Sequence, residues 1–418
     1  MGVFRITAII LLSLLQSFIA GAQIGSAGIP IPISDTVDHA DVIIASELNN
    51  ENDIVDVARN IMHPGIGKRM MTGEIKSRKL RASVVPAAGY TLQTDFAGIV
   101  GGNASFYTDT SANPSTVLTS LTYTSRSQII FPFQGNFWTS KDKYNILIDW
   151  RYLYFPSFTY GLGGYTSLSD GYLVNYSAIH IHQAVLRKLR KNMYIGLGFN
   201  LDYFWNIKEL NPPVFVATDF ENYGFAATEF ASGLTFNFLY DNRNNPINAR
   251  KGNFANVVYR PNLTIFGNTV TWHSLTIDIR KYITFPAGSK NVLAFWNYDW
   301  LTLSGKTPYL MLPNTGGDPY SNTGRGYIPG RYRGDDMVYL EGEYRINLSR
   351  SGIFGAVVFA NAQSFTELAS KRFETIAPGY GGGIRIKFNK FSRTNVSIDY
   401  AFGRGGSQGM FINVGEVF

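Results

Sequence analysis

The feature that most constrains the fold is a two-residue alternation of apolar and polar side chains that recurs from Ser83 to Phe418. In residues 193–205 every second position is large and apolar, and the positions between are mostly Gly, Asn or Asp. Residues 144–152 and 233–240 repeat the alternation, with aromatic side chains on the apolar face. Membrane-spanning strands alternate in this way because one face contacts lipid and the other a wet lumen. A soluble β-sandwich also alternates, but its outward faces are seldom so aromatic.

The alternation divides this region into sixteen strands, an even number, as single-chain outer-membrane barrels have. We therefore predict an all-β fold: a 16-stranded antiparallel transmembrane β-barrel with a short N-terminal periplasmic or plug segment. If the amino end is periplasmic, the four longest connections lie on the outer side. The predicted strands span residues 83–92, 95–108, 116–126, 128–138, 143–153, 173–187, 192–206, 226–241, 251–261, 269–283, 290–304, 336–347, 353–365, 379–389, 395–402 and 408–418. The long connections span residues 154–172, 207–225, 305–335 and 366–378.

The composition is unusual for a soluble enzyme. Aromatic residues make up 15% of the chain, charged residues only 16%, and 42 of the 418 residues are Gly. After the amino end no apolar run reaches the length of a membrane-spanning helix. The chain has no Cys, which excludes disulfides, thiolate metal sites and a Cys nucleophile. The net charge of +7 identifies no partner. Basic side chains raise the net charge equally whether they lie inside a barrel or near lipid headgroups.

The region before the barrel has two parts. Residues 1–22 have the pattern of a signal peptide, with Arg5, an apolar stretch and small residues at the end. A membrane anchor is the alternative, although the apolar stretch is short for a spanning helix. Residues 23–82 are predicted to be an N-terminal periplasmic tail or a plug segment, in which residues 52–62 have the apolar spacing of a short helix. The barrel domain is predicted over residues 83–418.

One long connection carries the candidate functional motif. Residues 305–335 are rich in Gly, Pro and Asn, which predicts a loop. Taken alone, its basic tip is compatible with a solvated surface loop. The strand that follows places Glu341 and Glu343 on one face. The loop-tip motif consists of Gly324, Arg325, Gly326 and Tyr327.

The chain ends in a strand that closes on an aromatic residue, Phe418. Alternation puts Met410, Ile412, Val414 and Phe418 on one face. Glu416 interrupts that face near the periplasmic end, where its charge can reach water. This ending looks like the signal by which barrel-assembly machinery recognises its clients. We therefore predict that Phe418, Val414 and Ile412 form a C-terminal assembly signal.

Taken in order, these features resemble the BamA/TamA-type family of outer-membrane proteins, also called the bacterial surface antigen family, in the version seen in Bacteroidetes. That family has a sixteen-stranded barrel whose sixth loop carries a Val-Arg-Gly-Phe/Tyr tip, and here Gly324 replaces Val. The loop falls between the eleventh and twelfth predicted strands, as the family requires. Residues 241–248 are similar to the family's Asp-Arg-Asn-Pro turn, and residues 396–403 with the closing strand look like its last two strands. The resemblance covers residues 83–418.

The resemblance implies a role for Arg325. In the family the loop folds back into the lumen, and its arginine pairs with acidic residues of late strands. Alternation places three carboxylates on inner faces, so we predict Asp399, Glu341 and Glu343 as the lumenal acidic partners of Arg325. One departure is Asn361, which stands where the family's thirteenth strand often has Asp. Asn361 can form hydrogen bonds but carries no charge.

A larger departure concerns function. Family members that assemble or translocate proteins collect clients through tandem POTRA modules, and residues 23–82 leave no room for a tandem set. Two functions stay open. One is a barrel that assists insertion or translocation of outer-membrane or surface proteins, with a seam that templates a client strand. The other is a passive pore or a structural, surface-antigen barrel without assembly activity.

The implied setting is the outer membrane of a Gram-negative bacterium, with the protein integral to it. The expected partners are outer-membrane lipid, the barrel-assembly machinery during biogenesis, client proteins, and periplasmic or lipoprotein partners. The sequence shows no nucleic-acid-binding signal.

A third class, an outer-membrane enzyme, finds no support in residue spacing. His273 and Ser274 are adjacent, so they point to opposite faces of a strand and cannot cooperate directly. His180 and His182 share a face and could bind a metal, but no acidic ligand lies nearby in sequence. The sequence therefore favours packing of these two residues in the aromatic belt or the lumen. We predict no catalytic residue, no cofactor and no metal site.

Overall fold

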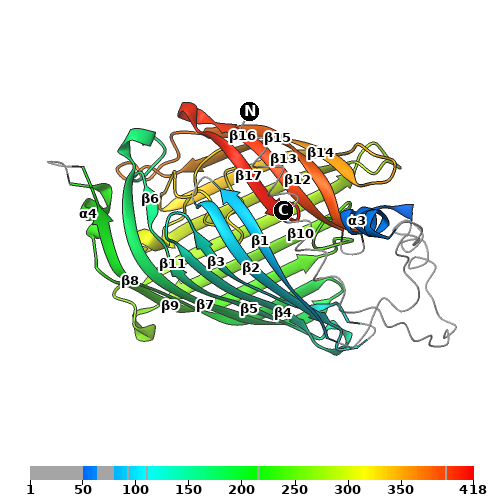
Figure 1. The fold of residues 1–418 in the computed structure, drawn as a ribbon. Coiled ribbons are helices and arrows are strands. Elements are labelled where there is room, and N and C mark those ends of the chain that lie inside the picture. Colours follow the sequence, from blue (N-terminus) through cyan, green and yellow to red (C-terminus); the bar gives the residue numbers. More distant parts are fainter. Residues whose placement is uncertain (1–49, 64–79, 92–93, 110–111, 214–216, 391–392) are drawn as a thin grey trace.

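The computed structural model describes residues 50–63, 80–91, 94–109, 112–213, 217–390 and 393–418. The predicted signal peptide and most of segment 23–82 lie outside the described residues. Tilted strands wrap around a common axis, as Figure 1 shows. In the described ranges no helix is both long enough and apolar enough to cross a membrane.

Apart from the short β6, each strand pairs antiparallel with the next along the chain, as the alternating pattern predicts. Their bounds lie within a few residues of the predicted ones. The strands are β1 (Arg81–Thr91), β2 (Asp95–Phe106), β3 (Ser115–Thr124), β4 (Ile129–Trp138), β5 (Tyr144–Tyr154), β6 (Ser157–Thr159), β7 (Tyr172–Arg190), β8 (Met193–Leu210), β9 (Glu229–Asp241), β10 (Gly252–Asn262), β11 (Trp272–Thr284), β12 (Val292–Ser304), β13 (Asp336–Asn347), β14 (Phe354–Phe365), β15 (Ala377–Asn389), β16 (Thr394–Gly403) and β17 (Gln408–Val414).

The short strand β6 continues β5, so that the two together form one strand position of the barrel wall, which we call a stave. Both pair with β7 in consecutive registers. Pro156 lies between them and has no N–H to donate, which interrupts the ladder. Its carbonyl accepts a hydrogen bond from Gln128 Nε2 at 2.8 Å instead. Among the described residues the seventeen strands therefore make sixteen staves, and the predicted sixteen-stranded barrel is confirmed.

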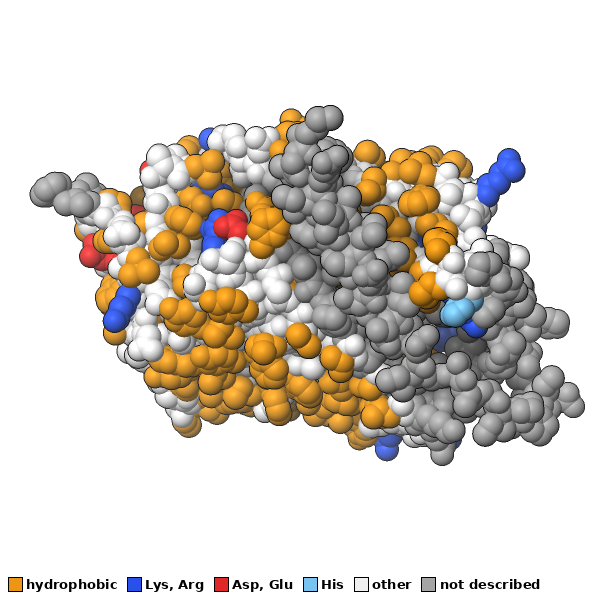
Figure 2. Space-filling model, in the orientation of Figure 1, with side chains coloured by type: hydrophobic (Ala, Val, Ile, Leu, Met, Phe, Trp, Pro, Cys, Tyr) orange, Lys and Arg blue, Asp and Glu red, His pale blue; other side chains and the backbone are white. Residues whose placement is uncertain are grey.

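The two faces of each strand differ as the alternation predicts. On β8, Ile195 and Leu197 are 44% and 57% exposed on the outside, whereas Tyr194 and Asp202 are 3% and 5% exposed. Figure 2 shows hydrophobic side chains gathered over the outer surface of the strands. An apolar outer band of this kind suits contact with lipid, because apolar side chains that face lipid are not exposed to water.

Helices lie at both ends of the barrel (Figure 1). The predicted short helix is confirmed as α3, in which Asp53 caps the amino end by accepting the Asp56 N–H at 2.8 Å. Helix α4 lies at the opposite end, in the connection between β8 and β9. The helices are α3 (Ile54–Met62), α4 (Asp219–Gly224) and the short 3-10 turns η1 (Ser140–Asp142), η2 (Leu168–Asp170), η3 (Thr264–Phe266), η4 (Tyr309–Met311) and η5 (Arg404–Gly406).

The long connection between β12 and β13 packs inside the barrel. Two of its aromatic residues, Tyr327 and Tyr332, belong to one buried cluster with inward-facing residues of the wall. Among these wall residues are Trp296, Tyr339 and Phe365. The loop tip is therefore a packed part of the interior.

Candidate functional site

Two glycines position Arg325 at the tip of the loop. Gly324 and Gly326 have φ angles of 79° and 104°, a region that favours glycine. A Cβ at Gly326 would lie 2.7 Å from the Phe402 carbonyl oxygen, and a Cβ at Gly324 would lie 2.5 Å from Thr315 Cγ2. The Gly-Arg-Gly sequence thus lets the backbone approach β16 closely.

The guanidinium of Arg325 contacts all three carboxylates that the sequence predicted. Its Nη1 donates to Asp399 Oδ2 at 3.0 Å, and its Nη2 donates to Glu343 Oε2 at 2.6 Å and to Glu341. These four side chains are at most 3% exposed. The guanidinium also lies 3.5 Å from the centre of the Phe359 ring, a cation–π contact. We call Arg325 with its three carboxylates the Arg325 cluster.

Further hydrogen bonds hold the tip on either side of the guanidinium. Asn361 Nδ2 donates to the carbonyl of Arg325 at 2.9 Å. The hydroxyl of Tyr327 accepts the Arg404 N–H at 2.7 Å and donates to the carbonyl of Pro378. Asn361 therefore binds the loop backbone, which explains how an uncharged residue serves at this position.

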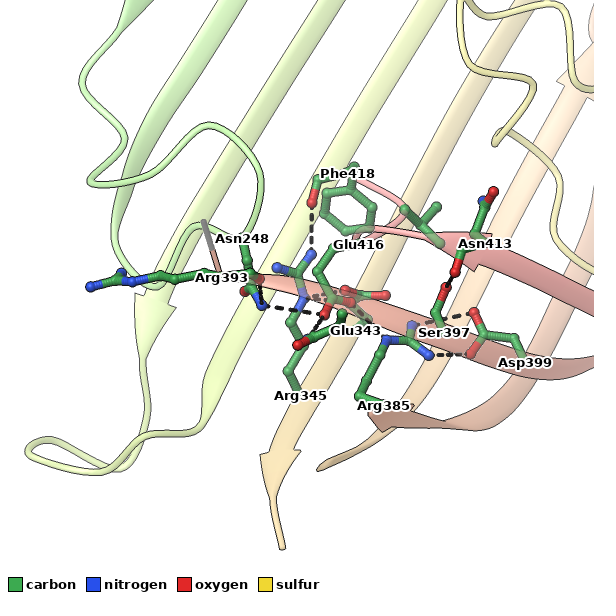
Figure 3. A network of polar contacts seen from close by, with 12 residues as sticks. Asn248, Glu343, Arg345, Arg385, Arg393, Ser397, Asp399, Asn413, Glu416 and Phe418 are labelled. Atoms are coloured by element: carbon green, nitrogen blue, oxygen red, sulfur yellow. Dashed lines mark hydrogen bonds and ion pairs between the residues drawn. The ribbon is translucent and has the colours of Figure 1, made fainter. Parts of the chain in front are cut away.

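The charges continue along the inner wall to two arginines that the sequence analysis did not single out (Figure 3). Arg385 donates from Nε to Glu416 at 2.7 Å and from Nη1 to Asp399 at 2.5 Å. Arg345 pairs with Glu343, which precedes it by two residues on the same strand face. Three buried arginines thus face four buried carboxylates. The arginines are Arg325, Arg345 and Arg385, and the carboxylates are those of Glu341, Glu343, Asp399 and Glu416. Charges can be buried in this way only when each has a partner.

The residues after β17 turn inward. β17 ends at Val414, which is 69% exposed, and Gly415 has a φ of 114°. Phe418 is only 5% exposed, and its ring centre lies 5.2 Å from that of Trp296. The prediction that Phe418 shares a face with Val414 and Ile412 is therefore wrong, because the strand ends at Val414 and the chain turns at Gly415. A role of these residues as an assembly signal stays a prediction.

Two polar contacts hold the inward-turned end (Figure 3). The carbonyl of Phe418 accepts a hydrogen bond from Arg345 Nη2 at 2.7 Å. The side chain of Glu416, which was expected to reach water, is only 1% exposed and accepts from Asn395 Nδ2 at 2.5 Å. That expectation is wrong for the same reason, the turn of the chain after β17.

A second group of charges lies where the segment before α3 meets the barrel. Glu51 is 1% exposed and pairs with Arg250 and Lys290, both at 3.0 Å, and with Lys387. Burial opposes ionisation of Glu51, but the charge and hydrogen bond of Lys387, aided by Arg250 and Lys290, outweigh it and lower the pKa of Glu51 to about 2. We call these four residues the Glu51 cluster.

The neighbouring residues strengthen this attachment. The side chain of Lys390 pairs with Asp56 at 2.8 Å, and its N–H donates to Asp53 at 2.9 Å. The Asn52 N–H donates to the carbonyl of Ser351 at 2.8 Å. Ser351 lies between β13 and β14 and Lys390 lies between β15 and β16, so that α3 is fixed to the late strands.

The first and last strands form the seam of the barrel. β17 lies beside β1 (Figure 1). In the described part of the chain these two strands share no β-ladder, whereas every other pair of neighbouring staves does. With seven residues, β17 is also the shortest stave. Unpaired strand edges present N–H and C=O groups to which a further strand can bind.

A sixteen-stave barrel with an apolar outer face and an arginine-anchored loop in its lumen defines the class of outer-membrane-type β-barrels. The Omp85 superfamily domain matches residues 200–416, which is more than half of the chain. The chain therefore belongs to the Omp85 superfamily. No curated protein matches the sequence significantly.

Solved structures share the fold at low sequence identity. BamA from Haemophilus ducreyi lacking POTRA domains 1-3 has a TM-score of 0.52 and 14% identity, over 88% of this chain and 80% of that one. CdiB from Escherichia coli has a TM-score of 0.53 and 11% identity, over 82% and 63%. CdiB from Acinetobacter baumannii has a TM-score of 0.51 and 10% identity, over 81% and 59%. The family resemblance read from the sequence is confirmed, and at these identities the structural likeness concerns the fold alone.

Proposed function

We propose that this protein is an integral outer-membrane barrel of a Gram-negative bacterium that assists the insertion or translocation of outer-membrane or surface proteins. The observation that carries this proposal is the seam, where β1 and β17 lie side by side without a shared ladder in the described residues. A client strand can add to such an edge through main-chain hydrogen bonds. Membership of the Omp85 superfamily supports this proposal.

The Arg325 cluster gives the two sides of the seam different support. It links the loop to β13 and β16, and β16 is paired with β17 along seven residues. The late wall is therefore braced from inside, whereas β1 has its ladder with β2 alone among the described residues. We expect the β1 side to move when the seam opens.

The partners follow from this mechanism. Outer-membrane lipid surrounds the apolar face, and the barrel-assembly machinery inserts the chain during biogenesis. Client proteins meet the seam, and periplasmic or lipoprotein partners deliver them. The mechanism uses no cofactor and no catalytic residue.

A disulfide across the seam tests the proposal. The chain has no Cys, so a pair of cysteines, one in β1 and one in β17, forms its only disulfide. A matched control is Ile398→Cys with Ile412→Cys, register partners in the β16–β17 pair, which leaves the seam free. Each variant replaces the depleted wild type, and the outer-membrane proteome is measured with and without reductant.

We expect the seam disulfide to remove a set of other barrels or surface proteins from the outer membrane, with recovery in reductant and no loss in the control. An unchanged proteome with a fully oxidised seam contradicts the assembly role and favours the structural barrel. Conductance separates the passive pore: the loop in the lumen predicts small currents, and a large steady conductance would support a pore.

A further inference from the structure

Two histidines and an aspartate converge inside the barrel, on strands that carry no member of the Arg325 cluster. His180 and His182 lie on β7, and Asp202 lies on β8 directly opposite His180. His180 Nδ1 lies 2.5 Å and His182 Nε2 lies 2.8 Å from the same oxygen, Asp202 Oδ1. The sequence analysis missed the acidic group because it comes from the register of the next strand, not from a neighbouring position in the chain.

Asp202 is held so that this oxygen stays directed at the two imidazoles. The residue is 5% exposed, and its other oxygen, Oδ2, accepts a hydrogen bond from Arg260 Nη1 at 2.5 Å. Arg260 is fixed in turn by the carbonyls of Asn200 and Ala231. Outer groups of this kind orient the carboxylates that bind metal ions.

The two imidazoles remain open to the lumen. Their side chains are 19% and 34% exposed, and both line a lumenal cavity of about 690 Å³ together with Asp202 and Arg260. An ion from solution can therefore reach the three ligand atoms, and water in the cavity can complete its coordination.

We propose that His180, His182 and Asp202 bind one divalent transition-metal ion of the zinc class. The three ligand atoms lie within 4.8 Å of one another, and two imidazole nitrogens with one carboxylate oxygen are a donor set that suits Zn²⁺ and its neighbours in the first transition row. Without an ion each ring donates an N–H to Oδ1. With an ion each ring carries its proton on the other nitrogen, so that the lone pair faces the metal.

The position of the site indicates its effect. β7 and β8 have 19 and 18 residues and are the longest strands that the structure describes. The ion joins side chains across this pair near its middle and adds a bond that the backbone ladder lacks. The positive charge of Arg260 opposes the ion, so we expect weaker binding than the same three ligands would give without a neighbouring cation.

Metal titration of the full chain tests the site. The protein is purified in detergent without a histidine tag, and Zn²⁺ binding is measured by calorimetry, with Co²⁺ absorption as a second probe. We expect one ion per chain. Replacing both ligands, His180→Gln with His182→Gln, should weaken binding at least about 100-fold. The matched control is His273→Gln, since this imidazole bonds to Tyr259 elsewhere on the wall and should not affect binding.

X-ray absorption spectroscopy of the zinc-loaded wild type tests the site without any variant, so misfolding of a variant cannot affect the result. We expect the spectrum to show two imidazole rings in the coordination shell of the zinc ion. A shell without imidazole, the absence of saturable binding, or equal binding by the double variant overturns the site. In each of those cases the three residues serve only to hydrogen-bond one another.

Discussion

The Arg325 cluster and the Glu51 cluster are close to mirror images in charge. In the first, one cation meets three carboxylates, and in the second, one carboxylate meets three cations. Both central side chains are buried. Their partners differ, because the carboxylates around Arg325 are at most 3% exposed whereas Lys290 is 37% and Arg250 is 21% exposed.

A similar charge pattern therefore gives a lasting contact in the lumen and a reversible one at the end of the barrel. Inside the lumen, loss of one partner leaves other charges buried without compensation, which is strongly unfavourable. At the end of the barrel, Lys387 is buried, but Lys290 and Arg250 stay partly hydrated, so water and salt can replace part of the contact. We therefore expect the loop to stay docked under conditions that release α3.

Removal of the central arginine should give the largest effect. Arg325→Ala takes from Glu341 its arginine partner and leaves Glu343 and Asp399 with one arginine each, Arg345 and Arg385, and we expect loop docking to lose about 3–5 kcal/mol. The barrel should still insert, because its strand ladders do not depend on this side chain. The measurement is cleavage of residues 305–335 by external protease.

The control for this variant is Arg350→Ala, which removes an exposed arginine from the turn between β13 and β14. It should leave the loop as resistant as in the wild type. Equal resistance of Arg325→Ala and Arg350→Ala would show that the cluster does not anchor the loop.

A smaller effect is expected at Asn361. Asn361→Asp restores the acidic residue of the resembling family but removes the donor to the Arg325 carbonyl. We expect this change to weaken loop docking by about 1–2 kcal/mol, since the carbonyl loses its partner and faces a negative charge. Hydrogen exchange of the loop measures it, with Asn361→Ala as the uncharged comparison. Slower exchange in Asn361→Asp would mean that the new carboxylate reaches the guanidinium.

Acid should weaken the Glu51 cluster. The pKa of Glu51 falls from an ordinary 4.5 to about 2 when α3 is docked. The lowered pKa means that the charge contributes its full stabilisation above about pH 4.5, and that this contribution is lost as the pH falls towards 2. The protection of residues 54–62 from hydrogen exchange, measured relative to an unfolded peptide at the same pH, should therefore fall across this window.

The matched variant is Glu51→Gln, which has no carboxyl group to titrate. Its helix should exchange faster than the wild type at pH 7, and the difference between the two should vanish near pH 2. A constant difference over the whole range would contradict the assigned cause.

Salt should have the smallest effect and should separate the two clusters most clearly. Raising NaCl from 50 mM to 1 M shortens the screening length to about 3 Å. We expect exchange of α3 to accelerate several-fold and exchange of the loop around Arg325 to stay unchanged, both measured on the same sample. Equal acceleration of both segments would remove the distinction between them.

The sequence predicted most of the barrel because alternation is a local signal. Every predicted strand has its counterpart, and the inward positions of Glu341, Glu343 and Asp399 follow from counting residues along one strand. The loop contact was predictable only through the family resemblance. Phe418 turns into the lumen after the strand ends at Val414, with a positive φ at Gly415, and alternation cannot show where a strand ends.

Contacts that depend on register or on docking were beyond the reach of the sequence. Asp202 meets His180 because β7 and β8 pair in one particular register. Glu51 pairs with Lys387, which is more than three hundred residues away in the sequence. No pattern in the segment before α3 indicates that partner. Such pairs are set by the three-dimensional arrangement of the strands and of the segment before α3.

The Arg325 cluster also constrains the order in which the molecule can fold. Arg325 and Asp399 are separated by 74 positions, and β13, β14 and β15 lie between them. The contact with Asp399 can form only when β13 to β16 have paired, because that pairing brings β16 to the loop. Docking of the loop is thus a late event, and a docked loop reports that the wall from β13 to β16 has already been assembled.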